Sequence, residues 1–146
     1  MAGAVCCDTS FLFSLYGQDI NTLKAAALAR QLEQPVSLTV LNEFEFLNAV
    51  ELSMFRKILP PPLGAAMIAA FASDLAAGSA VIESCNLGQI MAEAKRISGA
   101  YTAAGGYRSF DILHVAAALQ LTARNFFSFD ARQRALAKVA GLKVLP

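Results

Sequence analysis

The segment Ala4-Val5-Cys6-Cys7-Asp8, near the start of the chain, is a short apolar run that stops at an acidic residue. Four consecutive apolar side chains, with β-forming types among them, predict a buried strand over residues 4–7. The acid that follows is a poor continuation of such a strand. We therefore expect a buried first strand that ends at Asp8.

The rest of the chain alternates between further candidate strands and helices. Asn21 and Ser109 are candidate N-caps, and the run of three prolines that begins at Pro60 stops a helix. Strands spaced by helices need crossover connections, which produce a mainly parallel sheet covered on both faces. We expect strands at residues 36–40, 80–84, 125–129 and 142–145, and helices at residues 22–32, 41–58, 63–77, 87–103, 109–122 and 131–140.

The composition favours one globular domain over residues 1–146, with 56% hydrophobic and 16% charged residues. A mean hydropathy of +0.50 is high for a soluble monomer, which suggests that a second copy or a partner covers some apolar surface. The longest apolar stretch, residues 63–72, is far shorter than the roughly 20 residues of a membrane-spanning helix. The N-terminus also lacks the basic start of a signal peptide, so we expect a cytoplasmic protein without membrane association.

The three cysteines do not form the framework of a disulfide-rich protein. Cys6, Cys7 and Cys85 are odd in number and lie in apolar runs. We expect them to pack as small buried hydrophobic side chains.

Asp8 and Asp130 share one position in the predicted fold, the junction between a strand and a helix. Each could simply cap the helix that follows, since an aspartate accepts hydrogen bonds from the free N–H groups of a first turn. The carboxyl ends of parallel strands lie on the same edge of a sheet, where α/β proteins bind ligands. This shared edge favours a joint functional role for the two acids.

Asp111 lies in the first turn of its predicted helix, where the helix dipole alone favours a carboxylate. Arg108 lies three residues before it and His114 three residues after it, so the three occupy adjoining parts of one face. The small residues Ala116, Ala117 and Ala118 would let this helix pack closely on the sheet. That packing would bring Asp111 toward the other acids.

Glu43 and Glu45 compete for the remaining acidic position, on the helix predicted over residues 41–58. They are two residues apart, so they point to different faces of the helix. Glu45 shares its face with Ala49 and Leu52, and Glu43 shares its own with other apolar residues. Periodicity therefore leaves both alternatives open.

Clustered carboxylates predict a divalent cation, because they repel one another and are costly to bury unless a cation neutralises them. Oxygen ligands of this kind select Mg²⁺ or Mn²⁺, held together with water and often with substrate phosphates. A zinc site of several histidines is excluded, because His114 is the only histidine. We expect His114 to pack or hydrogen-bond at the edge of the site. The sequence also lacks a glycine-rich phosphate loop of either common type.

At these residues the chain resembles the PIN-domain family, and within it the VapC-like toxin ribonucleases of bacteria and archaea. Each motif is short, but their order along the chain is that of the family. The matching segments are VCCDTS at residues 5–10, EFLNAV at 45–50, RSFDILHVAAAL at 108–119, FSFD at 127–130 and AGLKVLP at 140–146.

The resemblance implies a three-layer α/β/α sandwich with a central, mainly parallel sheet. It implies that Asp8, Glu45, Asp111 and Asp130 surround one or two Mg²⁺ or Mn²⁺ ions. It favours Glu45 over Glu43, because the small residue four positions after the acid, here Ala49, belongs to the family pattern. Thr9, Ser10 and Ser128 would support the site by hydrogen bonding, and Arg108 would contact phosphate.

The resemblance further implies a metal-dependent endoribonuclease that cleaves single-stranded RNA with a metal-activated water, leaving a 5′-phosphate and a 3′-hydroxyl. Such a protein would be the toxin of a toxin–antitoxin pair, form a homodimer and be inhibited by a small antitoxin protein. Two alternatives stay open. One is a catalytically inactive PIN-like module that binds RNA or serves as a scaffold. The other is a magnesium-dependent DNA nuclease or phosphatase, although the phosphatase would want an aspartate where the chain has Ser10.

Overall fold

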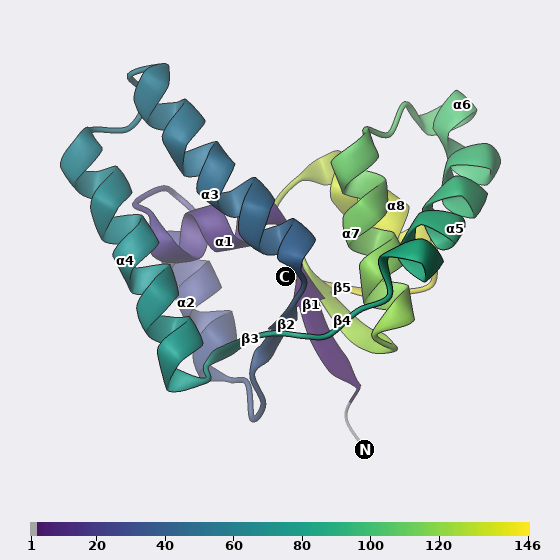
Figure 1. The fold of residues 1–146 in the computed structure, drawn as a ribbon, viewed down its shortest axis with the longest axis horizontal. Helices are drawn as coiled ribbons and strands as arrows, with labels where there is room; N and C mark the ends of the chain where they lie inside the picture. The colour runs from purple at the N-terminus through teal and green to yellow at the C-terminus, as the bar shows by residue number, and fades with distance from the viewer. Residues whose placement is uncertain (1–2) are drawn as a thin grey trace.

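The fold is built on a five-stranded sheet in which every strand pair is parallel (Figure 1). The computed structural model describes residues 3–146 of the chain. The strand order is β3-β2-β1-β4-β5, so the predicted first strand lies at the centre of the sheet. The strands are β1 (Ala4–Cys7), β2 (Val36–Leu38), β3 (Ala80–Ile82), β4 (Ala123–Phe127) and β5 (Lys143–Leu145).

Helices cover both faces of the sheet, which confirms the predicted α/β/α sandwich (Figure 1). One face carries α1, α2 and α4, and the other carries α5, α7 and α8. Helix α3 packs against α1 and α4 and also reaches α7. The bounds are α1 (Thr9–Tyr16), α2 (Thr22–Arg30), α3 (Val40–Phe55), α4 (Pro61–Ala77), α5 (Leu87–Ile97), a π-helical turn (Ser98–Thr102), α6 (Ala103–Gly105), α7 (Ser109–Gln120) and α8 (Ala131–Val139).

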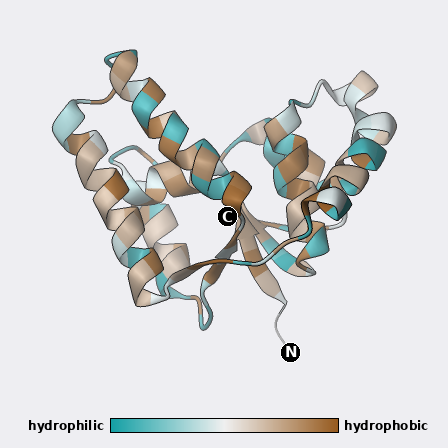
Figure 2. Cartoon of the chain, in the orientation of Figure 1, coloured by the Kyte–Doolittle hydropathy of each residue, from teal (hydrophilic) through white to brown (hydrophobic). Residues whose placement is uncertain are grey.

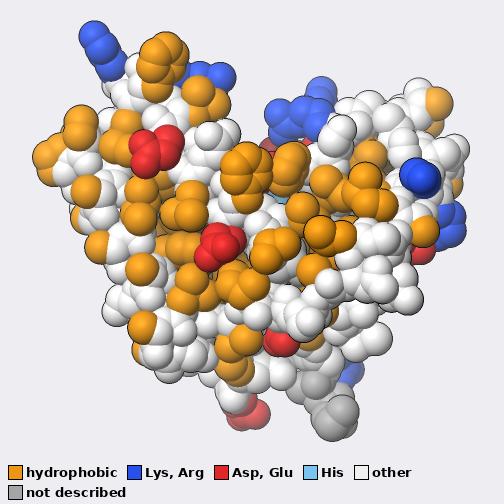
Figure 3. Space-filling model, viewed as in Figure 1, with side chains coloured by type: hydrophobic (Ala, Val, Ile, Leu, Met, Phe, Trp, Pro, Cys, Tyr) orange, Lys and Arg blue, Asp and Glu red, His pale blue; other side chains and the backbone are white. Residues whose placement is uncertain are grey.

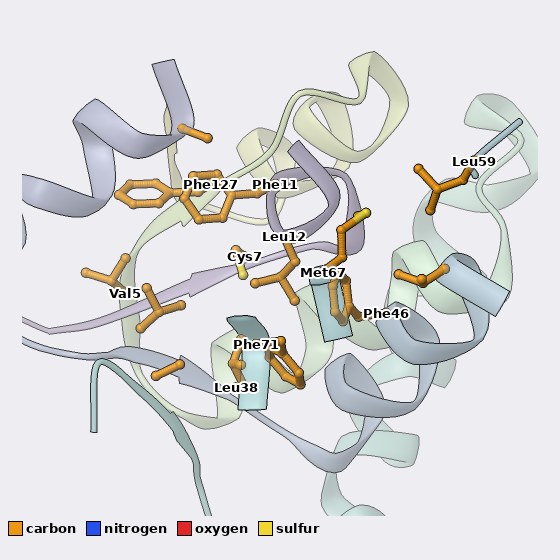
Figure 4. Packing of buried hydrophobic residues seen from close by; sticks show 14 residues of the cluster. Val5, Cys7, Phe11, Leu12, Leu38, Phe46, Leu59, Met67, Phe71 and Phe127 are labelled. Atoms are coloured by element: carbon orange, nitrogen blue, oxygen red, sulfur yellow. The ribbon is translucent and has the colours of Figure 1, made fainter. Parts of the chain in front are cut away.

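Alternation of side chains along β1 divides the core into two clusters, one on each face of the sheet. Val5 and Cys7 pack in the first cluster with Phe127, and Figure 4 shows this packing. Cys6 packs in the second cluster with Phe126. Because both faces are covered, every position of the strand is apolar, and this is the physical origin of the run that ends at Asp8.

Cys6 and Cys7 behave as predicted, as small buried side chains, whereas Cys85 is only partly buried. Cys6 and Cys7 are buried, Cys85 is half-buried in the second cluster, and all three are free thiols. Burial, reinforced by the charge of Glu83, raises the pKa of the Cys6 thiol to about 12. Such a thiol is unreactive at neutral pH.

Helix α7 packs closely on the sheet through its small residues, as expected. Ala116, Ala117 and Ala118 are at most 3% exposed, and the helix contacts β1 and β4. Figure 2 shows α7 as largely hydrophobic, whereas hydrophilic residues recur along α3 and α5. Within residues 3–146, no helix combines the length and the hydropathy needed to cross a membrane.

Several predicted boundaries were wrong, and so was one predicted cap. Strand β2 stops at Leu38 because Thr39 caps α3, accepting a hydrogen bond from the Leu41 N–H at 3.2 Å. Strand β4 covers Ala123–Phe127 rather than residues 125–129, in register with β1. Ser109 is the first residue of α7 and not its cap, which is Arg108.

Candidate active site

All four predicted acids line one pocket of about 540 Å³ between α3 and α7. Figure 3 shows the molecule hollowed between the arm that carries α3 and α4 and the arm that carries α5 to α7. The acids come from four different elements: the residue after β1, the middle of α3, the first turn of α7 and the cap of α8. The lining residues are Asp8, Thr9, Ser10, Glu45, Asn48, Ala49, Leu52, Arg108, Ser109, Phe110, Asp111, Asp130 and Gln133.

Asp8 is the most buried of the four acids, at 4% exposure. Its Oδ1 accepts hydrogen bonds from the Ser10 hydroxyl at 2.7 Å and from the Phe11 N–H at 3.1 Å, so it also caps α1. Its Oδ2 accepts from the Ser128 hydroxyl at 2.8 Å. Burial raises the pKa of Asp8, and these three hydrogen bonds offset only part of that rise.

The hydroxyl groups expected to support the site all contact its acids. The Ser10 hydroxyl donates to Asp8 and accepts from the Phe129 N–H at 3.0 Å. The Ser128 hydroxyl likewise donates to Asp8 and accepts from the Asp130 N–H at 3.0 Å. These bonds tie the end of β1 to the loop that follows β4. The Thr9 hydroxyl instead donates to Glu45.

Glu45, and not Glu43, lines the pocket. Its Oε1 accepts from the Thr9 hydroxyl and lies 2.8 Å from His114 Nε2. Partial burial on its own raises the pKa of Glu45, but the hydrogen bonds of His114 and Thr9 outweigh it and hold that pKa below its usual value. The side chain is therefore a carboxylate at neutral pH.

Asp111 and Asp130 face the pocket from the starts of their helices. Asp111 Oδ2 accepts from the Arg108 N–H at 3.3 Å and from Arg108 Nε at 3.4 Å. Asp130 caps α8, because its Oδ1 accepts from the Gln133 N–H at 2.9 Å. The caps expected for Asp8 and Asp130 are thus present together with the shared pocket.

The donor set fits Mg²⁺ or Mn²⁺. Glu45 Oε2, Asp111 Oδ1 and Asp130 Oδ2 make no hydrogen bond within residues 3–146, so each of these three acids keeps one oxygen for a ligand. In this part of the chain, no three His, Cys, Asp or Glu side chains lie close enough to hold one ion directly. Mg²⁺ is usually held by one or two carboxylates, with water and substrate phosphates completing its shell. The pocket suits that mode of binding.

Comparison with protein families matches residues 5–139 to the family described as PIN domain. The match covers most of the chain and includes all four acids. The chain belongs to the PIN-domain family. No curated protein sequence matches the chain.

A solved structure shares this PIN fold. The crystal structure of Mycobacterium tuberculosis VapC20, described as a Sarcin-Ricin loop cleaving toxin, is similar with a TM-score of 0.69. The similarity covers 95% of this chain and 96% of that chain, at 19% sequence identity. At this identity the likeness establishes the fold.

Two buried polar residues of this PIN domain were missed by the sequence reasoning. Gln133, 1% exposed, links two acids: its N–H binds Asp130, and its Nε2 donates to the Asp111 carbonyl at 2.9 Å. Asn42, 4% exposed, lies between the end of β1 and His114. Both stand three residues after an N-cap, the spacing of a capping box, and that spacing is the signal that could have found them.

Proposed function

We propose that this PIN domain is a metal-dependent endoribonuclease that cleaves single-stranded RNA, acting as the toxin of a toxin–antitoxin pair. One observation carries the proposal: four carboxylates from four separate elements line a single pocket, with the buried Asp8 among them. Such a set of acids is unfavourable in a protein unless a cation neutralises it. Within residues 3–146, no Lys or Arg side chain hydrogen-bonds Asp8.

In this proposal Asp8, Glu45, Asp111 and Asp130 hold Mg²⁺ or Mn²⁺. The bound ion would supply a water of lowered pKa and would neutralise charge on the phosphate under attack. Ser10, Ser128 and Thr9 hold the carboxylates in place through the hydrogen bonds described above.

Arg108 is proposed to contact the RNA backbone at the rim of the pocket. Its side chain is 70% exposed and, within residues 3–146, its only hydrogen bond is a long one of 3.4 Å to Asp111. A cation that is exposed and loosely paired can turn toward a phosphate with little loss. Arg108 therefore suits a role in orienting the substrate.

The test of the function is an assay with single-stranded RNA and DNA of matched sequence. We expect cleavage of RNA with Mn²⁺ or Mg²⁺, 5′-phosphate products, and no cleavage when a chelator is present. Cleavage of DNA alone, or of a phosphomonoester alone, would instead favour a DNA nuclease or a phosphatase. A folded sample that cleaves none of these with metal present would favour an inactive binding module.

The apolar surface supports a second copy as a further part of the proposal, together with a small antitoxin protein as inhibitor. Several large hydrophobic side chains are exposed, and Figure 3 shows hydrophobic side chains of all sizes on the face between the two arms. Burying exposed apolar area is the main favourable term in association. The exposed set is Ile20, Leu23, Val40, Phe44, Leu52, Phe55, Ile58, Leu87, Met91 and Val139.

We therefore expect the purified protein to have twice the chain mass of 15.5 kDa in solution, as measured by light scattering during gel filtration. Phe44 is 62% exposed, so a Phe44→Ser change removes apolar area without disturbing the core. This variant should shift the equilibrium toward the monomer if Phe44 lies in the interface. A parent protein that stays monomeric at high concentration would contradict the homodimer.

A further inference from the structure

His114 is buried between α3 and α7, and both of its ring nitrogens face polar partners. Its side chain is 1% exposed. Nε2 lies 2.8 Å from Glu45 Oε1, and Nδ1 lies 3.3 Å from Asn42 Nδ2. Asn42 and Glu45 are three residues apart on α3, so they occupy neighbouring positions on the helix surface. A buried histidine with two such contacts has a defined proton position.

Asn42 can adopt only one amide orientation. Its Oδ1 accepts from the Thr39 N–H at 2.9 Å, and its Nδ2 donates to the Cys7 carbonyl at 3.0 Å. A flipped amide would place an NH₂ group against the Thr39 N–H and an oxygen against the Cys7 carbonyl. Both of those pairs are repulsive, since a backbone N–H only donates and a carbonyl only accepts. The second hydrogen of Nδ2 therefore points to His114.

This orientation fixes the tautomer of His114. Because Asn42 Nδ2 donates, His114 Nδ1 must accept and carries no proton. The ring proton is then on Nε2, where it is donated to Glu45 Oε1. The Thr9 hydroxyl donates to the same oxygen, so two donors hold Oε1 while Oε2 makes no hydrogen bond within residues 3–146.

The same contacts tie Glu45 to the strand that carries Asp8. The Cys7 carbonyl, which accepts from Asn42, belongs to the peptide group whose N–H is that of Asp8. That N–H donates to the Phe127 carbonyl of β4 at 3.1 Å. One continuous series of hydrogen bonds thus runs from the end of β1 through Asn42 and His114 to Glu45. It restrains two acids that come from different elements.

We propose that His114 is a positioning residue, held by Asn42 as the Nε2–H tautomer, which fixes Glu45 with its second oxygen free to ligate the metal ion. The proposal rests on the proposed function, because it assigns Glu45 to that ion. Partners that orient a ligand in this way typically contribute roughly 10–100-fold to metal affinity or activity. An apolar residue would fill the same space without fixing the carboxylate.

The tautomer can be measured without metal or RNA. His114 is the only histidine of the chain, so the imidazole of a protein labelled with ¹⁵N-histidine gives a single pattern in long-range ¹H–¹⁵N correlation spectra. We expect the neutral ring to carry its proton on Nε2 and none on Nδ1. A proton on Nδ1 in the parent protein would overturn the proposal. In the Asn42→Asp variant, which offers only acceptors, a proton should appear on Nδ1, and an unchanged pattern would also count against the proposal.

The positioning role is tested by a pair of substitutions whose Mn²⁺ affinity is measured by calorimetry. His114→Gln keeps an amide donor near the position of Nε2, whereas His114→Leu fills the space with an apolar group. We expect His114→Leu to bind Mn²⁺ roughly 10-fold more weakly or worse and His114→Gln to stay close to the parent. Equal losses in both variants would show that His114 only packs, and would overturn the role. Circular dichroism and melting curves verify that both variants are folded.

The tautomer of His114 and its effect on metal binding are tested independently of each other. A parent protein that binds no Mn²⁺ and cleaves no RNA would contradict the proposed function. It would also contradict the assignment of Glu45 to the metal ion. The ¹⁵N pattern would still decide whether Asn42 sets the tautomer. If the parent binds Mn²⁺ and the two His114 variants lose Mn²⁺ affinity equally, the proposed function is not contradicted. The positioning role of His114 is then overturned.

Discussion

The Asp8→Asn variant should lose metal-dependent RNA cleavage by roughly 10²–10⁴-fold while it keeps the fold. Asp8 is the most buried acid of the pocket and lies at the end of the central strand. An ion that stabilises a reacting phosphate contributes several kcal/mol, and each 1.36 kcal/mol corresponds to about tenfold in rate. Removing the charge of Asp8 weakens the binding of that ion. The measurement is the rate of RNA cleavage at saturating Mn²⁺.

Asparagine should fit the position of Asp8 without loss of structure. It has nearly the same shape, and its oxygen can accept the hydrogen bonds that Ser10 and Phe11 donate to Oδ1. Its amide can donate to the Ser128 hydroxyl, which lies 2.8 Å from Oδ2 of Asp8. A melting temperature equal to or above that of the parent is therefore expected for the metal-free variant at neutral pH.

The pH dependence of stability gives this variant a second readout. Burial raises the folded-state pKa of Asp8 above its ordinary value of 3.8, so the folded protein binds this proton more tightly than the unfolded chain. The contribution of Asp8 to the free energy of unfolding is complete below pH 3.8 and is lost as pH rises through the raised pKa. The metal-free parent should lose stability relative to Asp8→Asn across that window, and Mg²⁺ should restore it.

Three outcomes would contradict the role of Asp8. Cleavage by Asp8→Asn at the parent rate would remove this acid from the active site. The difference in stability between the variant and the metal-free parent could also be independent of pH. That result would show that burial does not raise the pKa of Asp8. Loss of cleavage together with loss of the fold would instead make Asp8 a structural residue.

Glu45→Gln should lower RNA cleavage on the order of 10²-fold, whereas Glu43→Gln should leave it within about 2-fold of the parent. The two residues lie on the same helix and the changes are chemically identical, so each variant is the matched control of the other. Glu45 lines the pocket with Asp8 and Asp111, and Glu43 does not. The glutamine can still accept hydrogen bonds from Thr9 and His114, so the change removes charge rather than contacts.

This pair is read from initial rates over a series of Mn²⁺ concentrations. Loss of ligand charge predicts that Glu45→Gln needs more Mn²⁺ for half-maximal activity, which separates a metal ligand from a general loss of activity. A large effect of Glu43→Gln with none of Glu45→Gln would reverse the assignment. Equal and small effects in both variants would exclude α3 from the ligand set.

Local signals were enough to predict that Asp8, Asp130 and Asp111 lie near one another, and the structure places all three around one pocket. The first two follow strand ends in a parallel sheet, whose carboxyl ends share one edge, and the third lies in the first turn of a helix whose small residues pack on that sheet. Asp8 and Asp130 cap their helices and also line the pocket. In Asp130 the cap uses Oδ1 and leaves Oδ2 without a hydrogen bond within residues 3–146.

Other parts of the site could not be predicted from local sequence patterns. Both faces of α3 carry apolar residues next to an acid, so its periodicity could not say which of Glu43 and Glu45 faces the pocket. The contacts of Gln133 with the Asp111 carbonyl and of Asn42 with the Cys7 carbonyl join residues 22 and 35 positions apart. Such pairings depend on how the helices dock and leave no local periodicity.

The sequence by itself determined the alternation of strands and helices, the buried run that ends at Asp8 and the chemistry of the acids, because these follow from local hydropathy and residue type. Only the tertiary structure decided that the first strand lies at the centre of the sheet and that α3 turns Glu45 rather than Glu43 to the pocket. It also decided that Asn42 and His114 join Glu45 to the end of that strand. Strand order, helix rotation and hydrogen-bond partners arise from packing between distant segments, where many weak contacts act together and no single stretch of sequence specifies the result.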